Sequence, residues 1–254
     1  MKSLVGFKTL VWREIYRFFS VFTQTIIPPV VSSFLYIFIF GFSLGQKIET
    51  VHGLPYLVFL IPGLVMMYVI EGSYSNTSSS LFISRWANNI EDLLVTPLSY
   101  FEMVLAILIG GLARSLVVAT GVYLVSLCFV HFPIAHPLIV FYFLIFVSLG
   151  FSSVGMIVAL FAEEFEHLSI CTTFVITPLI FFGGVFHSLE MVPAAVRWLT
   201  VFNPMFYMIN GLRYGMLNVS DTPLLQSSVV VFGFFVGLFL LAVYLFRIGF
   251  KLRK

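Results

Sequence analysis

Long apolar stretches separated by short polar segments set the pattern of this 254-residue chain. A helix that crosses the hydrocarbon core of a bilayer needs roughly 20 mostly apolar residues. Stretches of this kind lie near 22–44, 55–82, 101–130, 137–161, 168–187 and 227–246. The pattern predicts an all-α polytopic membrane protein with six transmembrane helices. No internal repeat or linker interrupts it, so we expect residues 1–254 to form a single transmembrane domain.

Residues 2–20 have a different pattern, because polar and apolar residues occupy opposite sides of one predicted helix. The polar side carries Lys2, Thr9, Arg13, Arg17 and Ser20, and the apolar side carries Leu4, Phe7, Val11, Ile15 and Phe18. Such a helix typically lies in the interfacial plane of a membrane. We therefore expect an N-terminal amphipathic interfacial helix.

The region 188–226 interrupts the apolar pattern before the last span. Its run from Met191 to Met208 is apolar, yet it contains two prolines, an arginine and an asparagine: Pro193, Arg197, Asn203 and Pro204. Proline and charged residues are disruptive or costly at the centre of the bilayer. We expect two short re-entrant or interfacial helices here rather than a seventh span.

Composition excludes a soluble domain, because 60% of the residues are hydrophobic, only 9% are charged and the mean hydropathy is +1.08. The net charge of +2 is too small for a nucleic-acid-binding surface. Lysine and arginine gather at both ends of the chain, and such residues favour the cytoplasmic side. Both termini are therefore predicted to be cytoplasmic, which requires an even number of spans.

The polar segment 84–100 is the most informative of the connections. Asn88 followed by Glu91 has the spacing of a capping box, and Pro97 would stop the helix that begins there. We expect a short cytosolic helix that turns Ile90, Leu93 and Leu94 to one side. That apolar side either fits a groove on a partner or rests on the membrane surface of its own chain.

Three features resemble one family. The phrase EDLLVTPLS at 91–99, the amphipathic start and the phrase NPMFYMINGLRYGML at 203–217 look like ATP-binding-cassette permeases of the ABC-2 type. The resemblance implies a homodimer that works with two copies of a separate ATPase subunit in the bacterial inner membrane. It also implies that a coupling helix docks on the ATPase, and assigns this role to Asn89, Ile90, Glu91, Asp92, Leu93, Leu94 and Val95.

The chain carries no sign of nucleotide chemistry of its own. No Gly-Lys dipeptide occurs in it, so the phosphate-binding loop GxxxxGK[ST] is absent. We expect this chain to bind no cofactor and no metal, with ATP and Mg²⁺ held by the partner subunit. The acidic loop 162–167, AEEFEH, is either a solvated loop or a second contact with that subunit; a metal site there is the weakest alternative.

Glu71 and Arg114 are the ionisable residues deepest in the predicted spans. Each lies about 20 Å from the inner end of its helix, at 1.5 Å per residue. Equal depth on adjacent antiparallel helices favours an intramembrane ion pair. Two alternatives stay open: separate polar contacts in a wet cavity, and a site for substrate or protons.

Below Glu71 the second span is polar nearly all round, with the sequence GSYSNTSSS. Such a segment either packs closely against other helices or faces an aqueous path. In ABC-2 permeases the second and fifth spans line the conduit. By that similarity the translocation path is assigned to Ser73, Asn76, Thr77 and Ser80 on the second span and to Ser169, Thr172, Thr173 and Thr177 on the fifth.

Together these features predict a permease subunit that exports an amphiphilic, lipid-linked, polysaccharide or drug-like substrate and performs no covalent chemistry itself. Membrane lipids, a second copy of the chain and the ATPase are its expected partners. One rival is a secondary transporter that uses Glu71 as an ion or proton carrier, although no duplicated architecture is visible. A second rival, an intramembrane enzyme, lacks a convergent nucleophile and base.

Overall fold

A computed structural model describes residues 2–43 and 50–252, and nearly all of its elements are helices. Among the described residues, five helical segments are long and apolar enough to cross a membrane. They are Phe22–Gly41, which is formed by α2 (Phe22–Thr25) and most of α3 (Ile27–Ser43), then α4 (Tyr56–Trp86), α6 (Tyr100–Ser126), α7 (Pro137–Phe161) and α12 (Leu224–Arg247). The chain is therefore a polytopic helical membrane protein, as predicted.

The predicted fifth span is shorter and less regular than the others. It consists of α8 (Glu166–Cys171), a π-helical turn η1 (Thr172–Ile176) and α9 (Thr177–Phe182), three consecutive parts of 6, 5 and 6 residues. The helix ends at Gly183, and Gly184 has a left-handed backbone with φ of 87°. A left-handed glycine is a common helix terminator, so the span ends before the predicted residue 187.

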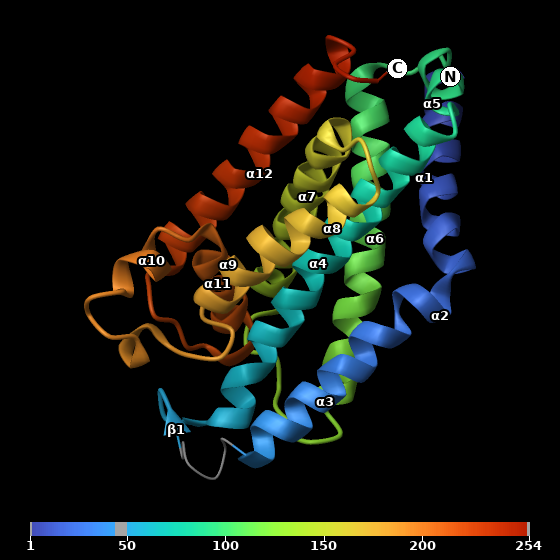
Figure 1. Ribbon diagram of the computed structural model, residues 1–254. Coiled ribbons are helices and arrows are strands. Elements are labelled where there is room, and N and C mark those ends of the chain that lie inside the picture. Colours follow the sequence, from blue (N-terminus) through green and yellow to red (C-terminus); the bar gives the residue numbers. More distant parts are fainter. Residues whose placement is uncertain (1, 44–49, 253–254) are drawn as a thin grey trace.

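α4 lies at the centre of the bundle, and α6 and α7 pack along it (Figure 1). The N-terminus, the C-terminus and the short helix α5 (Ile90–Leu94) lie at one end of the molecule. A small antiparallel hairpin, β1 (Thr50–Val51) and β2 (Leu54–Pro55), lies at the opposite end. This arrangement agrees with two termini on the same side and with a short helix between the second and third spans.

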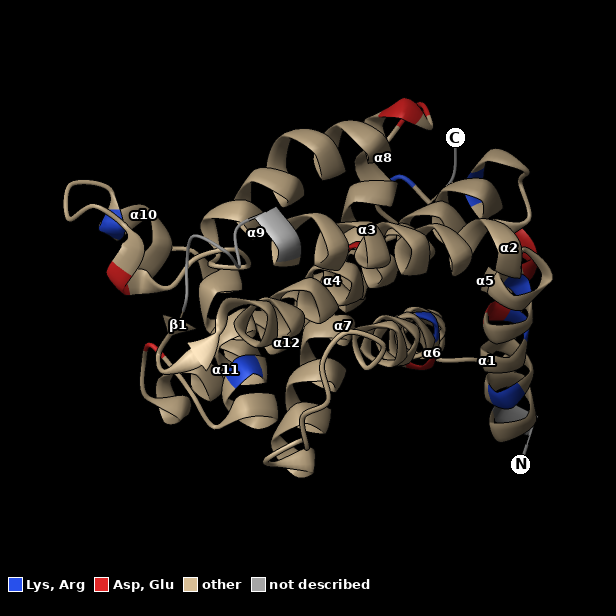
Figure 2. Cartoon of the chain, turned by 90° about the horizontal axis from the view of Figure 1, so that it is seen from below, with Lys and Arg blue, Asp and Glu red and all other residues tan. Residues whose placement is uncertain are grey.

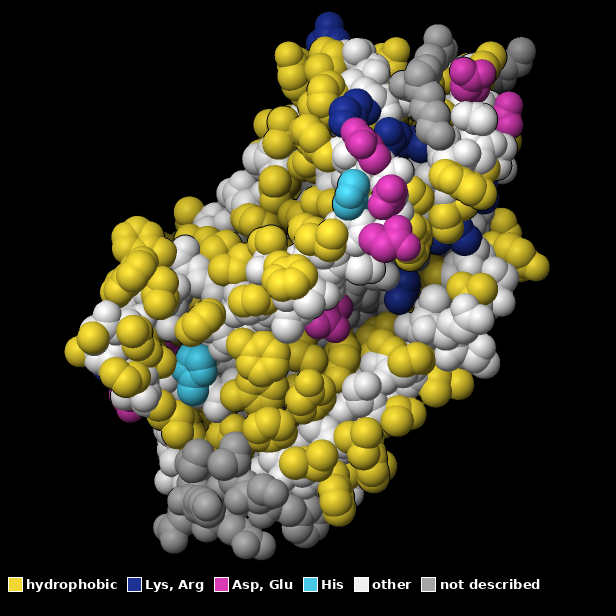
Figure 3. Space-filling model, in the orientation of Figure 1, with side chains coloured by type: hydrophobic (Ala, Val, Ile, Leu, Met, Phe, Trp, Pro, Cys, Tyr) yellow, Lys and Arg dark blue, Asp and Glu magenta, His cyan; other side chains and the backbone are white. Residues whose placement is uncertain are grey.

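Charge is distributed unevenly over this bundle. Lysine, arginine, aspartate and glutamate residues gather along α1 (Lys2–Ser20) and α5, as Figure 2 shows. On the face drawn in Figure 3, most charged side chains lie toward the end that carries both termini, and apolar side chains cover most of the remainder. An apolar belt next to one charged end is the surface expected of a protein embedded in a bilayer.

α1 forms over the predicted residues, but its apolar side is partly covered by protein. Leu10 and Phe18 are buried, and Phe7 and Val11 pack against the buried cluster at the end of the bundle that carries both termini. The most extensive contacts of α1 are with α6. Leu4, Trp12 and Tyr16 are exposed. The amphipathic prediction is confirmed, whereas a position in the interfacial plane stays a prediction.

The helix α5 forms at the predicted place with a different cap. Asn88 has a left-handed backbone with φ of 57°, and the N-cap residue Asn89 makes no side-chain capping bond. The capping box predicted for Asn88 and Glu91 is therefore wrong. A capping box is instead found at the start of α6, where Ser99 and Glu102 bond each other's backbone N–H groups.

The region before the last span contains two helices, α10 (Arg197–Val201) and α11 (Pro204–Leu217), and a 3₁₀ turn η2 (Leu189–Met191). Pro204 occupies the first turn of α11, and the side chain of Asn203 accepts a hydrogen bond from the backbone N–H of Met205. Proline at this position and asparagine as N-cap both favour helix initiation. α11 packs against α4, α7 and α12, so it belongs to the bundle.

Small residues let α4 and α7 approach closely. A Cβ atom added to Gly155 would lie 2.5 Å from the carbonyl oxygen of Tyr74 and 3.1 Å from the backbone nitrogen of Ser78. Backbone atoms inside a packed helix cannot move away cheaply, so a larger residue must push the two helices apart.

We predict that Gly155→Ala lowers the stability of the protein by about 1–3 kcal/mol, the usual range for an overpacked core. Gly237→Ala on α12 is the matched control, because nothing lies within 4 Å of a Cβ atom added there. Thermal unfolding in detergent should show a lower Tm for Gly155→Ala and an unchanged Tm for Gly237→Ala. Equal Tm values would contradict the α4–α7 contact.

Candidate translocation site

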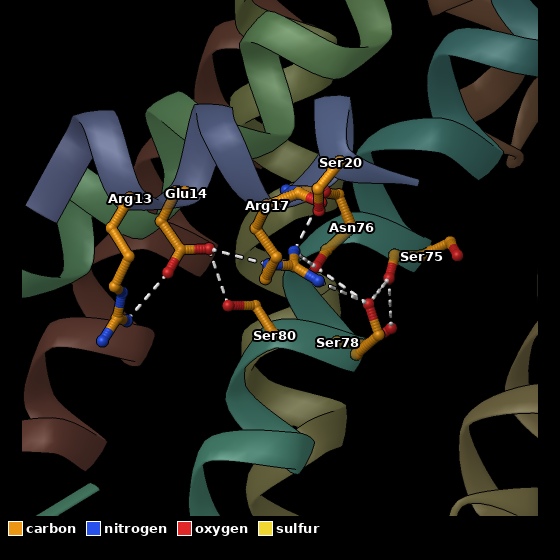
Figure 4. A network of polar contacts seen from close by, with 9 residues as sticks. Arg13, Glu14, Arg17, Ser20, Ser75, Asn76, Ser78 and Ser80 are labelled. Atoms are coloured by element: carbon orange, nitrogen blue, oxygen red, sulfur yellow. Dashed lines mark hydrogen bonds and ion pairs between the residues drawn. The ribbon is translucent and has the colours of Figure 1, made fainter. Parts of the chain in front are cut away.

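A buried carboxylate joins α1 to the polar half of α4. The Glu14 side chain is fully buried, and it accepts a hydrogen bond of 2.6 Å from the hydroxyl of Ser80. Its oxygen atoms also lie 2.8 Å from a nitrogen of Arg13 and 3.4 Å from Nε of Arg17 (Figure 4). A buried carboxylate needs such partners, because leaving one uncompensated typically costs about 3–5 kcal/mol.

Arg17 extends the same contact further along α4. Its guanidinium donates to the backbone oxygen of Asn76 at 2.7 Å and to the side-chain oxygen of Asn76 at 3.0 Å. Burial lowers the pKa of Arg17, and the charge of Glu14 opposes that shift. Gly110 on α6 provides the room for this arrangement, since a Cβ atom there would lie 2.6 Å from Cβ of Glu14.

The polar stripe predicted to line a path on α4 is therefore inside the protomer. Ser73, Asn76 and Thr77 are fully buried, and Ser80 is 4% exposed. Ser73 donates to the carbonyl oxygens of Val69 and Ile70, and Ser73 and Thr77 lie beside Gly111 of α6. In this structure the four residues serve packing and the contact with α1, which was the alternative reading of the stripe.

A different side of α4 faces open space. Glu71 and Ser75 lie one turn apart and line a cavity of 350 Å³ together with Tyr68, Gly72, Pro29 and Arg114. Across the cavity lie Ser169, Thr172 and Thr173 of the predicted fifth span. The structure thus brings three predicted path residues of the fifth span to a polar cavity, and opposes them with Glu71 and Ser75.

The predicted ion pair between Glu71 and Arg114 is not formed. Both side chains line the cavity, but no ion pair within 4.0 Å and no hydrogen bond joins them or engages either one elsewhere in the described chain. Nε of Arg114 is buried without a partner. The arrangement fits the alternative of separate polar positions on a shared cavity.

Backbone geometry sets the direction of the hydroxyls on the opposite wall. The N–H of Thr177 donates to the carbonyl oxygen of Thr172, five residues earlier, so the helix widens by one residue in this turn. Pro178 follows in the first turn of α9 and has no N–H to donate. Ser169 and Thr173 are exposed at the cavity, whereas Thr177 is half-buried and does not line it.

The apolar side chains of the short helix α5, which were expected to project into the cytosol, attach this helix to the bundle. Ile90 is 2% and Leu93 6% exposed, and both join a buried cluster formed with residues of α1, α4, α6 and α12. The expectation that Ile90, Leu93 and Leu94 project together into the cytosol is wrong, because the nearest apolar surface is their own bundle. Glu91, Asp92 and Val95 are exposed instead.

A second cavity of 390 Å³ lies between α5, the end of α4, the acidic loop and the C-terminal segment. Arg85 of α4 donates to the carbonyl oxygens of Ala159 and Ala162, which end α7. A cation at a helix C-terminus compensates the unpaired carbonyl groups there. Lys251 forms an ion pair of 3.3 Å with Glu163, so the acidic loop contacts the C-terminal segment.

At the opposite end, a buried cation joins the elements around the region before the last span. Arg213 of α11 is 1% exposed, donates to the carbonyl oxygen of Gly184 at 2.7 Å, and lies 3.5 Å from Asp221. Its guanidinium lies 3.9 Å from the ring centroid of Phe59. Asp221 also contacts Nε2 of His52 in the hairpin at 2.9 Å. Arg213 therefore lies in a closed polar cluster at this end of the bundle.

Two of these residues were not predicted to matter. Glu14 stands four residues from both Leu10 and Phe18, so helical spacing alone puts a carboxylate on the apolar side of the first helix. That anomaly was a readable signal of a buried polar contact. Asp221 carried no such signal, because it lies in a short polar segment whose neighbours are set by the fold.

A helical bundle with an apolar belt, a polar cavity beside its spans and a short helix on the end that carries both termini is the architecture of a polytopic membrane protein. Comparison with known sequences gives its family. The model of the ABC-2 type transporter family matches residues 5–217, so the chain belongs to that family. It is a transport permease rather than an enzyme, and ATP is hydrolysed by a separate subunit in this family.

Named relatives cover most of the chain. The inner membrane transport permease YadH of Escherichia coli (strain K12) is 39% identical over 250 residues, which are 98% of each chain. Nodulation protein J of Rhizobium meliloti is 26% identical over 209 residues, 82% of this chain and 80% of that protein. Similarity to an inner membrane permease and the apolar helices together support a multi-pass inner membrane protein.

We predict that the two sides of α4 differ in accessibility. In a background with both cysteines replaced, Ser75→Cys should react with a water-soluble maleimide, because Ser75 is exposed at the cavity. Ser73→Cys, the matched control two residues away, should react far more slowly, because Ser73 is fully buried. Faster labelling at position 73 would restore the path first assigned from the sequence.

We also predict that Glu14 and Ser80 are energetically coupled. Replacing Glu14 by Gln and Ser80 by Ala, singly and together, should give a coupling free energy of about 1.5–3 kcal/mol, the range for hydrogen bonds to charged groups. Thermal unfolding in detergent measures it. Fully additive effects would mean that α1 is held to α4 by other contacts.

Proposed function

We propose that this chain is the membrane subunit of an ATP-driven exporter, which assembles as two copies with two copies of a separate ATPase. Family membership supports the class, and the absence of a Gly-Lys dipeptide agrees with an ATPase on another chain. The observation that carries the proposal is the mounting of α5 on the bundle. A helix that transmits force must be held firmly on one side and accessible on the other.

α5 meets both conditions. Ile90 and Leu93 join the same buried cluster as residues of α4 and α6, so a displacement of α5 moves the inner ends of both helices. The exposed side offers Glu91 and Asp92, together with Val95, which is 82% exposed. An acidic surface with one protruding apolar side chain fits a partner groove that is basic at its rim and apolar at its base.

The motion would reach the cavity through α4. Because Glu14 and Arg17 bind Ser80 and Asn76, α1 moves with the inner half of α4 when α5 is pushed. The wall formed by α4 then shifts relative to the wall formed by Ser169 and Thr173. In this proposal the chain has six spans and both termini lie in the cytoplasm. The transporter moves an amphiphilic, lipid-linked, polysaccharide or drug-like substrate outward.

A secondary transporter is the second candidate, because Glu71 lines the cavity and forms no ion pair with any residue that the structure describes. In that case transport would depend on an ion gradient and continue without any ATPase. Transport into inverted vesicles distinguishes the two. ATP-dependent uptake that persists after the proton gradient is collapsed favours the exporter, and gradient-dependent uptake without ATP favours the carrier.

We predict that charge reversal on α5 removes the ATPase. A tagged chain with Glu91→Lys and Asp92→Lys is purified from its native membrane, and the ATPase that co-purifies is measured. We expect less than about a tenth of the wild-type amount, because lysines facing a basic groove place like charges together, which costs several kcal/mol at an interface. Glu190→Lys, an exposed acidic residue at the other end, is the control. Unchanged retention of the ATPase by the α5 variant contradicts the docking role.

A further inference from the structure

The cavity beside Glu71 contains hydrogen-bonding groups that the protein itself does not use. Arg114 has no hydrogen bond or ion pair within the described chain, and its Nε is buried. The hydroxyls of Ser75, Ser169 and Thr173 also donate to no protein group there. Unpaired donors in a membrane protein are costly, which makes such a group a candidate binding group.

The other partly or fully buried arginines contrast with Arg114. Arg17 donates to Asn76, Arg85 to the end of α7, and Arg213 to Gly184. Within the described residues, oxygen atoms of side chains and of the backbone satisfy these three arginines, whereas Arg114 has no such partner.

The shape of the site agrees with a small polar group. The cavity holds 350 Å³, near the lower end of the usual range for small-molecule sites, about 300–1,000 Å³. Pro29 adds an apolar side chain to its lining, and Phe174 and Val175, which follow Thr173 in the sequence, are exposed. A headgroup fits such a space while its acyl chain lies along the apolar surface outside.

Two opposite charges line the cavity without pairing. Glu71 offers two acceptor oxygens, and Arg114 offers a planar set of donors suited to a phosphate or carboxylate. A ligand that has only a negative charge would satisfy Arg114 and leave Glu71 without a partner. A ligand that also carries an ammonium or hydroxyl donor satisfies both.

We propose that this cavity binds the headgroup of an amphiphile that carries an anionic group beside an ammonium or hydroxyl donor. The anionic group lies on Arg114 with the hydroxyls of Ser169 and Thr173, and the donor group lies on Glu71. This inference rests on the proposed function and names the class of its substrate. Binding itself requires neither ATP nor the ATPase.

The test measures ligand-dependent thermal stabilisation of the purified permease in a neutral maltoside detergent. The probes are lauroyl lysophosphatidylethanolamine, dodecyl phosphate, a neutral dodecyl glucoside and inorganic phosphate. We expect the apparent affinity to be highest for the first, lower for the second and undetectable for the last two, because only bound ligand raises the Tm. Equal stabilisation by the glucoside, or by inorganic phosphate, overturns the proposal.

Variants locate the binding group. Arg114→Gln should weaken the binding of both phosphate amphiphiles by about tenfold or more, as loss of a charged hydrogen-bond partner does. Glu71→Gln should abolish the preference for the ethanolamine headgroup over dodecyl phosphate. Arg197→Gln, the same change at an exposed arginine, is the control. Wild-type affinity in Arg114→Gln overturns the proposal.

If Arg114→Gln does not fold, the double change Ser169→Ala and Thr173→Ala answers the same question, since both residues are exposed. It should lower the affinity for dodecyl phosphate and leave the Tm without ligand unchanged; unchanged affinity counts against the site. Loss of this binding with intact ATPase retention rejects the substrate class alone. If no ATPase co-purifies with the wild-type chain, the proposed function is rejected and the binding result still holds.

Discussion

The structure depends on the satisfaction of buried polar groups where water is absent. In the hydrocarbon region an unpaired donor or charge costs several kcal/mol, so each must find a partner within the protein or face a cavity. Glu14 does so with Ser80 and two arginines, and Arg213 does so with Asp221 and a backbone oxygen. These two contacts also join segments that are far apart in sequence, so the polar groups specify the packing of an otherwise uniform apolar bundle.

The same constraint divides the helix α4 into two working sides. One side is closed by α1, α6 and α7 through small residues and internal hydrogen bonds. The other side keeps Glu71 and Ser75 at a cavity opposite a hydroxyl-bearing wall. A polar helix in a membrane protein can thus be both a packing element and a lining element. Its rotation about its own axis decides which residues have which role.

Sequence patterns predicted the elements well and their orientations poorly. The span at 137–161 has the predicted bounds, because an apolar run between Pro137 and the acidic loop has clear ends. The sequence could not fix the lining side of α4, because the segment 73–80 carries polar side chains nearly all round and so gives no contrast between its faces. The direction of Leu93 was wrong for a related reason: on so short a helix an apolar side fits the chain's own bundle as well as a partner. The sequence could not show that Glu71 and Arg114 stay unpaired, because equal depth along two helices does not give the distance between their side chains.

The π-helical turn at Thr172–Ile176 has a mechanical consequence. It holds one residue more than the corresponding α-helical turn, and such turns are frequent at functional sites. Conversion of that turn to ordinary α-helix would rotate everything before it by about 100°, the angle of one residue. Ser169 would then leave the cavity while Pro178 stayed in place. The hydroxyl groups opposite Glu71 could therefore be rotated toward or away from a bound substrate while the part of the helix after the π-helical turn keeps its position.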